Sequence, residues 1–249
     1  ELGERSRDAF GSRLPFLLKI LSARRPLSLQ AHPDARMARN GFVRENQAGV
    51  DVTDSQRTFV DDWPKPEILV AMSDFEGLCG FRDPHETRQL FDGLDIRIPV
   101  DPVLGSLTER SGPAALAETF LDCLAGDDLR RQIVTEVVSG AVNHVGEDTP
   151  LGEFARTAVE LDEYFPGDPS ILAALMLNRI HLRPGEALAV PPGLMHSYLS
   201  GTGIEIMADS NNVVRGGLTD KHIDVDSLIE IVDFQTQEPW VMTAEEVDP

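Results

Sequence analysis

The amino-acid sequence predicts a mixed, mainly β protein: a sandwich or barrel of short strands, interrupted by a helical segment. Short apolar runs separated by turn residues about every eight to twelve positions fill both ends of the chain, as in sandwiches and barrels. Between these ends, apolar residues recur three and four positions apart, the spacing of amphipathic helices. The prediction therefore divides the chain into a first β part at 1–82, a helical insertion at 83–177 and a second β part at 178–249.

Length, charge and hydropathy exclude several classes of protein. The 249 residues are enough to bury a large core, and the formal net charge of −20 excludes a nucleic-acid binder, which needs a basic surface. No apolar run is long enough to span a membrane, and the opening residues lack the apolar stretch of a secretory signal. The two cysteines, outside any CxxC pair, are typical of reduced thiols, so the sequence favours a cytoplasmic protein.

In the first β part, the apolar run that starts at Leu14 predicts two strands joined by a turn at 23–26. The segment 34–49 is expected to contain a short polar helix followed by a loop, and residues 51–66 are expected to be loop-like. Glu67 then begins another strand, in which alternate residues share one face: Ile68, Val70 and Met72.

The helical insertion begins where Asp83 can cap a helix that has Pro84 at its first position and Glu86 at the capping-box position. Similar starts recur along the segment, at Gly112-Pro113, Asp127, Thr149-Pro150 and Asp168-Pro169.

The second β part contains apolar runs at 180–190, 195–199 and 203–210, each of which predicts strand structure. The tail predicts a short helix from Asp226 and a closing strand that ends near Phe234.

The stretch 185–199 carries the first chemical signal. Its Pro-Pro-Gly corner at 191–193 ends one strand, because proline cannot continue a central strand and glycine tolerates a positive φ. After the corner, His196 and Tyr198 are two positions apart, so a strand places both on one face. The order glycine, five residues, proline, four residues, histidine is also the spacing of the second motif of the cupin barrels. A purely structural histidine is the alternative.

Partners for His196 in a metal site must come from upstream. Gln30 and His32 are two positions apart and so share a face of a strand, and Glu67 begins the next strand. Two imidazoles and a carboxylate suit zinc or a neighbouring divalent ion, and glutamine adds a neutral oxygen. Each residue also has a simpler interpretation: a surface amide, a turn residue before proline and a solvated charge.

Cations gather beside these motifs, although the chain has 42 acidic and only 22 basic residues. In one cleft they would supply the local positive field that an anionic substrate needs; ordinary surface cations are the alternative. These four residues are Lys19, Lys65, Arg215 and Lys221. Glu205 alternates with Ile204 and Ile206, which leaves open whether its carboxylate faces inward or outward.

Three blocks of sequence together resemble the type I phosphomannose isomerases: LPFLLKILSARRPLSLQAHP from Leu14, WPKPE from Trp63, and GTGIEIMADSNNVVRGGLTDKHID from Gly201. The resemblance runs from about Leu14 to Phe234. It implies a cupin (jelly-roll) barrel with an α-helical insertion and one Zn²⁺ per chain. It also implies that mannose 6-phosphate and fructose 6-phosphate are interconverted through a cis-enediolate.

Carried over by position, the resemblance implies Gln30, His32, Glu67 and His196 as zinc ligands. It implies Arg215 as an active-site residue. For the proton-transfer group, our hypothesis is Glu205 or Lys65. Four further residues would lie around the substrate: Lys19, Ser28, Tyr198 and Lys221.

Two positions depart from the family pattern. Pro64 stands where the family commonly has histidine, and Asn211 stands where it commonly has aspartate. A proton-transfer role for that histidine or aspartate cannot apply here, because neither proline nor asparagine acts as a base. Family segments are also expected before Glu1 and after Pro249.

Two other functions remain open from the sequence. The chain could be a cupin that binds metal or sugar phosphate without turnover, or another metal-dependent cupin enzyme such as a dioxygenase. A small-molecule sugar phosphate is the expected partner, with no nucleic acid and no membrane. The sequence does not determine the oligomeric state, although a monomer is favoured.

Overall fold

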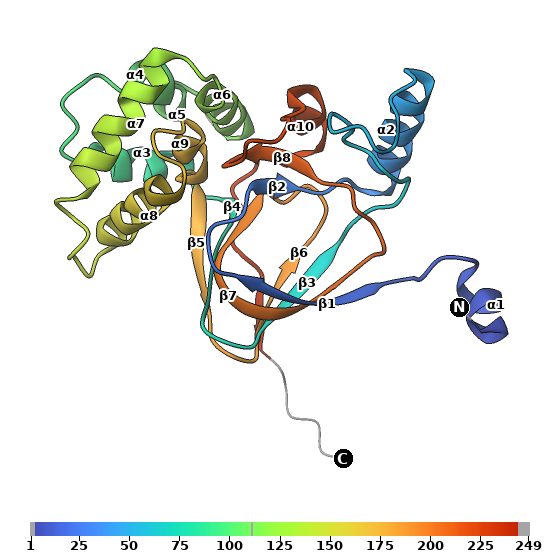
Figure 1. Ribbon diagram of the computed structural model, residues 1–249. Coiled ribbons are helices and arrows are strands. Elements are labelled where there is room, and N and C mark those ends of the chain that lie inside the picture. The colour runs from blue at the N-terminus through green and yellow to red at the C-terminus, as the bar shows by residue number, and fades with distance from the viewer. Residues whose placement is uncertain (1–2, 111, 244–249) are drawn as a thin grey trace.

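The computed structural model describes residues 3–110 and 112–243 (Figure 1). Its strands are β1 (Leu17–Ala23), β2 (Leu29–Ala31), β3 (Glu67–Ala71), β4 (Phe75–Phe81), β5 (Leu177–Leu182), β6 (Glu186–Val190), β7 (His196–Met207), β8 (Val214–Gly217) and β9 (Val241–Thr243). Its helices are α1 (Glu4–Phe10), α2 (Ala35–Gln47), α3 (Pro84–Asp92), α4 (Asp101–Leu104), α5 (Ser106–Glu109), α6 (Pro113–Cys123), α7 (Asp128–Ala141), α8 (Pro150–Tyr164), α9 (Ser170–Ala174) and α10 (Val225–Ile231). Within these ranges, no helix is long and apolar enough to cross a membrane.

The strands form an antiparallel, nearly closed barrel in which β7 is the shared strand. The first half of β7 pairs with β2 and β4, whereas its second half pairs with β1 and β3. Strand β8 pairs with β2 and β5 with β4, while β6 and β9 continue the sheet from β3. Figure 1 shows these strands curling around a common interior, with helices packed outside. The predicted mainly β barrel with a helical segment is confirmed.

Strand β7 bends at Gly201, where φ is +118°. Glycine adopts this angle without steric cost, whereas a Cβ here would lie 2.6 Å from Cδ2 of Phe75. The bend shifts the in-out alternation by one position. His196 and Tyr198 are buried before the bend, and Glu205 is buried after it. The bend therefore brings side chains from both halves of β7 into the same interior.

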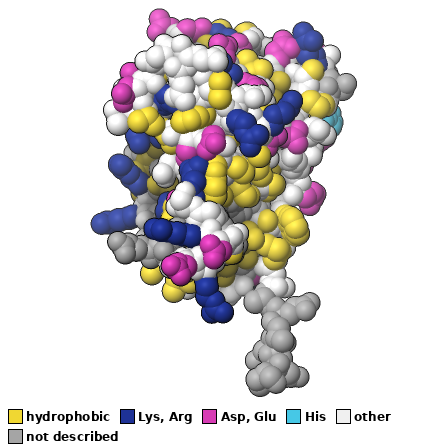
Figure 2. All heavy atoms as spheres, turned by 90° about the vertical axis from the view of Figure 1, so that its right-hand side faces the viewer, with side chains coloured by type: hydrophobic (Ala, Val, Ile, Leu, Met, Phe, Trp, Pro, Cys, Tyr) yellow, Lys and Arg dark blue, Asp and Glu magenta, His cyan; other side chains and the backbone are white. Residues whose placement is uncertain are grey.

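The apolar face predicted for β3 is its outer face. Ile68 and Met72 share it but are 38% and 54% exposed, whereas Leu69 on the other face is fully buried. The outer face continues across neighbouring strands, because Ile68 lies opposite Ile206 and Ile206 lies opposite Leu18. Figure 2 shows hydrophobic side chains gathered on one face of the molecule. Alternation thus identified which residues share a face, but not which face is buried.

Helices α3 to α9 pack together beside strands β4 and β5 (Figure 1). Phe81 at the end of β4 packs edge-on against Phe120 of α6, with ring centroids 5.5 Å apart. Arg179 of β5 forms ion pairs of 3.1 Å with Glu76 of β4 and 2.8 Å with Glu160 of α8. Apolar packing and ion pairing together fix the helical segment against the barrel.

The five predicted helix starts are confirmed. Three caps act as expected: Asp83 accepts hydrogen bonds from the backbone N–H groups of His85 and Glu86, Asp127 from Arg130, and Thr149 from Gly152. Helices α4 and α5 were not predicted, because four residues are too few to show a helical period.

Two strand predictions are wrong. The runs at 195–199 and 203–210 are one strand, β7, because the Gly-Thr-Gly sequence at 201–203 bends the strand without ending it. The closing strand near Phe234 is absent from the described residues, where Thr236 makes only an isolated bridge to Phe81.

Replacing Gly201 by alanine is expected to lower the free energy of unfolding by about 2–4 kcal/mol, measured by urea denaturation. The added Cβ would lie 2.7 Å from the Asp74 carbonyl oxygen, in a backbone conformation that already disfavours alanine. Gly185→Ala is the matched control, since Gly185 has a φ of +90° and no atom within 4 Å of the added Cβ. Equal losses in the two variants would contradict the close approach at the bend.

Candidate metal centre

Three adjacent strands place the first candidate residues in one row. Strand β2 lies between β7 and β8, with Gln30 opposite His196 on one side and opposite Arg215 on the other. Residues directly opposite each other in an antiparallel sheet have side chains on the same face. Gln30 and His196 are 166 positions apart in the sequence, so only closure of the barrel brings them together.

Three buried donor atoms converge beside this row. One ligand atom each from His32, Glu67 and His196 lies within 4.8 Å of the other two. Oε2 of Glu67 is 3.4 Å from Nε2 of His32 and 3.7 Å from Nε2 of His196. Among the described residues, neither Glu67 Oε2 nor His32 Nε2 has a hydrogen-bond partner. Buried polar atoms without partners are costly, and one cation at this point would bind both of them together with Nε2 of His196.

Backbone carbonyls fix the orientation of both imidazoles. Nδ1 of His32 lies 2.9 Å from the carbonyl oxygen of Asn212, and Nδ1 of His196 lies 3.0 Å from that of Leu194. A carbonyl oxygen only accepts, so each Nδ1 carries the proton and donates. Each Nε2 therefore presents its lone pair to the cluster, as in metal-ligating histidines.

The charge states also suit a metal ion. Burial and the neighbouring His32 lower the pKa of His196 to about 4, so its imidazole is neutral at pH 7. Burial opposes ionisation of Glu67, but His32 and Lys65 hold the pKa of this carboxyl well below its usual range. Lys65 lies 2.8 Å from Oε1 of Glu67, which leaves Oε2 facing the histidines. A neutral imidazole and an ionised carboxylate are the forms that bind metals.

Gln30 lies at the rim of the cluster. Its Nε2 is 3.3 Å from Nε2 of His196, whose Nδ1 already carries the proton. A half-turn of the amide would replace this donor with the Oε1 acceptor, and so add a neutral oxygen to the donor set. The set then matches the mixed nitrogen and oxygen ligands of a zinc site with room for a further ligand.

Asn212 supports His32 and was not predicted. Its side chain is fully buried and fastens the loop at 59–63: Oδ1 accepts from Val60 N at 2.9 Å, and Nδ2 donates to the carbonyls of Asp61 and Trp63, each at 2.9 Å. This network holds the carbonyl that accepts from His32. The sequence gives no sign of it, because an asparagine among turn residues is ordinarily a surface residue.

Glu205 faces inward, which resolves the alternative left open above. It is 6% exposed and lies opposite Lys19 across β7 and β1. Burial and the nearby Glu67 raise the pKa of Glu205. Tyr198 is also buried, its hydroxyl has no hydrogen-bond partner in the described part of the chain, and burial raises its pKa well above 10. Lys19 itself is exposed.

The remaining candidates line a hollow of about 770 Å³ between the barrel and the helical segment. Ser28, Arg215 and Lys221 contribute its barrel side. Burial lowers the pKa of Arg215, whose neighbour across the sheet is Gln30. The hollow therefore adjoins the donor cluster. By contrast, Asn211 is exposed and uses its backbone N–H to bond Asp61 at 2.9 Å.

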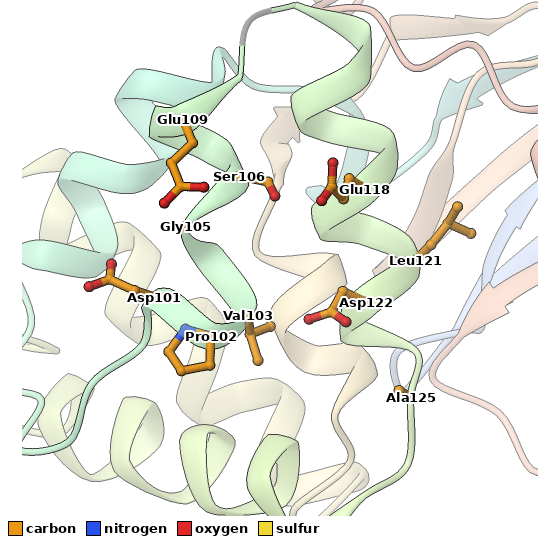
Figure 3. A pocket seen from close by; sticks show the side chains of 10 residues that line it. All are labelled: Asp101, Pro102, Val103, Gly105, Ser106, Glu109, Glu118, Leu121, Asp122 and Ala125. Atoms are coloured by element: carbon orange, nitrogen blue, oxygen red, sulfur yellow. The ribbon is translucent and has the colours of Figure 1, made fainter.

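A second hollow, of about 580 Å³, lies within the helical segment (Figure 3). Four carboxylates line it, but three already pair with arginines: Asp101 with Arg88, Glu118 with Arg110, and Asp122 with Arg130. Their charge is largely neutralised, so this hollow offers neither a metal centre nor an anion site.

Adding Zn²⁺ to metal-stripped protein is expected to raise its melting temperature by roughly 5–10 °C, because the ion binds only the folded state. Differential scanning calorimetry measures the shift. Glu67→Gln should abolish it, whereas Glu163→Gln, at an exposed position, should leave it unchanged. Each variant is compared with its own metal-stripped form, which separates metal binding from general destabilisation. A full zinc shift in Glu67→Gln would contradict the assignment of this carboxylate.

Known proteins provide an independent comparison. Residues 1–84 match the family model "Phosphomannose isomerase type I, catalytic domain". The mannose-6-phosphate isomerase of Escherichia coli K12 is 32% identical over 236 residues, which are 95% of this chain and 58% of that protein. The rat enzyme, from Rattus norvegicus, is 33% identical over 245 residues, 94% of this chain and 55% of its own length. The chain thus spans somewhat more than half the length of these relatives.

Solved structures agree in fold. A mannose 6-phosphate isomerase from Salmonella typhimurium, bound to its substrate fructose 6-phosphate and to zinc, superposes with a TM-score of 0.81 at 32% identity; the match covers 95% of this chain and 58% of that one. A zinc-bound mannose 6-phosphate isomerase superposes with a TM-score of 0.80 over the same shares. Over nearly its whole length, the chain is therefore a relative in sequence and in fold of the type I phosphomannose isomerases, zinc-dependent cupin enzymes, as the three sequence blocks indicated.

Proposed function

We propose that the chain carries the catalytic site of an aldose–ketose isomerase that interconverts mannose 6-phosphate and fructose 6-phosphate. The proposal rests on the meeting of buried donor atoms of His32, Glu67 and His196 beside a cationic hollow; among the described residues, those of His32 and Glu67 have no hydrogen-bond partner. A donor cluster alone would suit many metalloenzymes. The adjoining cations are what select an anionic sugar as substrate.

One Zn²⁺ per chain is the proposed cofactor, held by Gln30, His32, Glu67 and His196. The donor set fits zinc in ligand type, burial and protonation state. Bound there, the ion would supply Lewis-acid polarisation of the sugar oxygens.

Glu205 is the proposed proton-transfer group. Isomerisation requires removal of a proton from carbon 2, formation of a cis-enediolate and return of the proton to carbon 1. A buried carboxylate with a raised pKa is a stronger base than a solvated one, which suits Glu205. Lys65 is the less suitable base, because its ammonium group is already paired with Glu67 at 2.8 Å.

Negative charge develops on the sugar oxygens as the enediolate forms. Arg215, on the same face of the sheet as Gln30, is placed to stabilise that charge, and a half-buried guanidinium does so more strongly than a solvated one. The ammonium of Lys65 adds positive charge beside Glu67. The partnerless hydroxyl of Tyr198 is available to hydrogen-bond a sugar oxygen. Lys19, opposite Glu205, would favour the ionised carboxylate.

The phosphate end of the substrate is assigned to the hollow. Ser28 and Lys221 line it together with Arg215, and so offer one hydroxyl and two cations. The volume of about 770 Å³ accommodates a small ligand. The helical insertion at 83–177 supplies the opposite wall.

We further propose a cytoplasmic, monomeric protein. Cys79 and Cys123 are buried and form no disulfide, as expected for a reducing compartment. His32, Glu67 and His196 converge within one chain, so the proposed metal site draws these ligands from a single copy.

A coupled assay that detects fructose 6-phosphate should show turnover of mannose 6-phosphate by the zinc-loaded chain. Glu205→Gln is expected to reduce kcat by about 100-fold or more while zinc content stays the same. The exposed Glu163→Gln variant, which removes one carboxylate from helix α8 outside the barrel, is the matched control.

Two outcomes would contradict the proposal. Absence of turnover with one zinc bound per chain would exclude isomerase activity for this chain and favour a binding protein. A Glu205→Gln variant with kcat within about threefold of the parent would exclude Glu205 as the proton-transfer group.

A further inference from the structure

The hollow beside the metal centre is lined from both parts of the molecule. Arg25, from the turn after β1, contributes on the barrel side, and Arg131, from helix α7, contributes on the side of the helical segment. Neither residue belongs to the site implied by the sequence resemblance. Both side chains are exposed rather than packed into a core.

Although the chain as a whole is strongly acidic, the charged residues that line the hollow are mainly cations. Four cations line it, against two carboxylates, in a protein with a formal net charge of −20. One carboxylate, Asp168, is already engaged by the backbone N–H and hydroxyl of Ser170, at 2.9 and 2.8 Å. None of the four cations forms an ion pair within the described part of the chain. The four are Arg25, Arg131, Arg215 and Lys221.

Arg130 and Arg131 offer a comparison at adjacent positions. Both lie in the first turn of α7, where the helix dipole disfavours positive charge. Arg130 compensates by pairing with Asp122 and Asp127. Arg131 has only a 3.3 Å hydrogen bond to the carbonyl oxygen of Gly126 and lines the hollow instead. In this position the charge of Arg131 does not stabilise the helix. We therefore infer that it is available to an external anion.

Continuity with the metal centre suggests which anion this is. Arg215 lines the hollow and is also the cross-strand neighbour of the candidate ligand Gln30. A molecule with reacting oxygens at the donor cluster and its anionic group in the hollow would span the two. A phosphate dianion, with three acceptor oxygens, can bond several cations at once.

We propose that Arg25 and Arg131 bind the phosphate group of the substrate, and that the helical segment is therefore part of the substrate site. This inference rests on the proposed sugar-phosphate isomerase function. Arginine suits the task, because its planar fork of donors matches phosphate oxygens. The two residues would bind the phosphate and take no part in proton transfer.

Steady-state kinetics with mannose 6-phosphate test the proposal on zinc-loaded protein. Arg131→Ala and Arg25→Ala are each expected to raise KM about tenfold with kcat within about twofold, because the phosphate is bound equally in the ground and transition states. Arg39→Ala is the matched control: Arg39 is an exposed arginine of α2, and its loss removes one charge without touching the hollow. Its KM should stay unchanged.

Calorimetric titration with inorganic phosphate tests the same site without turnover. Its dissociation constant should rise by a similar factor in Arg131→Ala and Arg25→Ala but not in Arg39→Ala. This result would support the phosphate site even if the chain proved inactive as an isomerase, so the two proposals fail separately.

Three results would overturn the inference. The first is that both KM and phosphate affinity stay unchanged in Arg131→Ala and in Arg25→Ala. The second is an equal effect in Arg39→Ala, which would indicate only the general field of the protein. The third is a loss confined to kcat. A change in one variant alone would assign phosphate binding to that arginine and would exclude the other arginine from this role.

Discussion

The meeting of three buried donor atoms, one each from His32, Glu67 and His196, is the constraint on which the rest of the barrel depends. Among the described residues, Oε2 of Glu67 and Nε2 of His32 have no hydrogen-bond partner, and each is expected to cost about 1–3 kcal/mol if nothing compensates. The barrel nevertheless fixes them in place, through carbonyls that accept from both imidazoles and through Lys65 on the far side of the carboxylate. Such rigid support is the feature of a site preorganised for a cation.

The bend at Gly201 makes that support compatible with catalysis. Without it, Glu205 would follow the alternation set by His196 and Tyr198 and would face solvent. With it, one strand supplies a proposed metal ligand, a buried hydroxyl and a buried carboxylate of raised pKa to the same interior. The proposed reaction needs both a cation site and a base that is not a metal ligand. A single bent strand therefore holds the cation site and the base at fixed positions relative to each other.

Much of this arrangement could be predicted from the sequence, and the exceptions have physical reasons. Local signals predicted the helix starts, because proline and capping residues act within one turn, and the motif around His196 predicted its buried face. The inward direction of Glu205 could not be predicted, since it depends on a strand that bends where the sequence suggests a turn. The contributions of Asn212 and Arg131 depend on which distant segments meet, and no local pattern encodes that. The buried face of β3 could not be predicted for a related reason. Its inner face carries Glu67 and Ala71, whereas the apolar side chains of Ile68 and Met72 lie on the outer face.

The proposed zinc site is tested most directly by a crystal structure of the zinc-loaded chain, with the metal located by anomalous scattering at the zinc edge. One strong peak per chain is expected, at about 2.0–2.2 Å from Nε2 of His32, Nε2 of His196 and a carboxylate oxygen of Glu67, with the amide oxygen of Gln30 turned toward it. A zinc ion bound elsewhere, or a donor cluster that stays metal-free in zinc-saturated crystals, would contradict the proposed site.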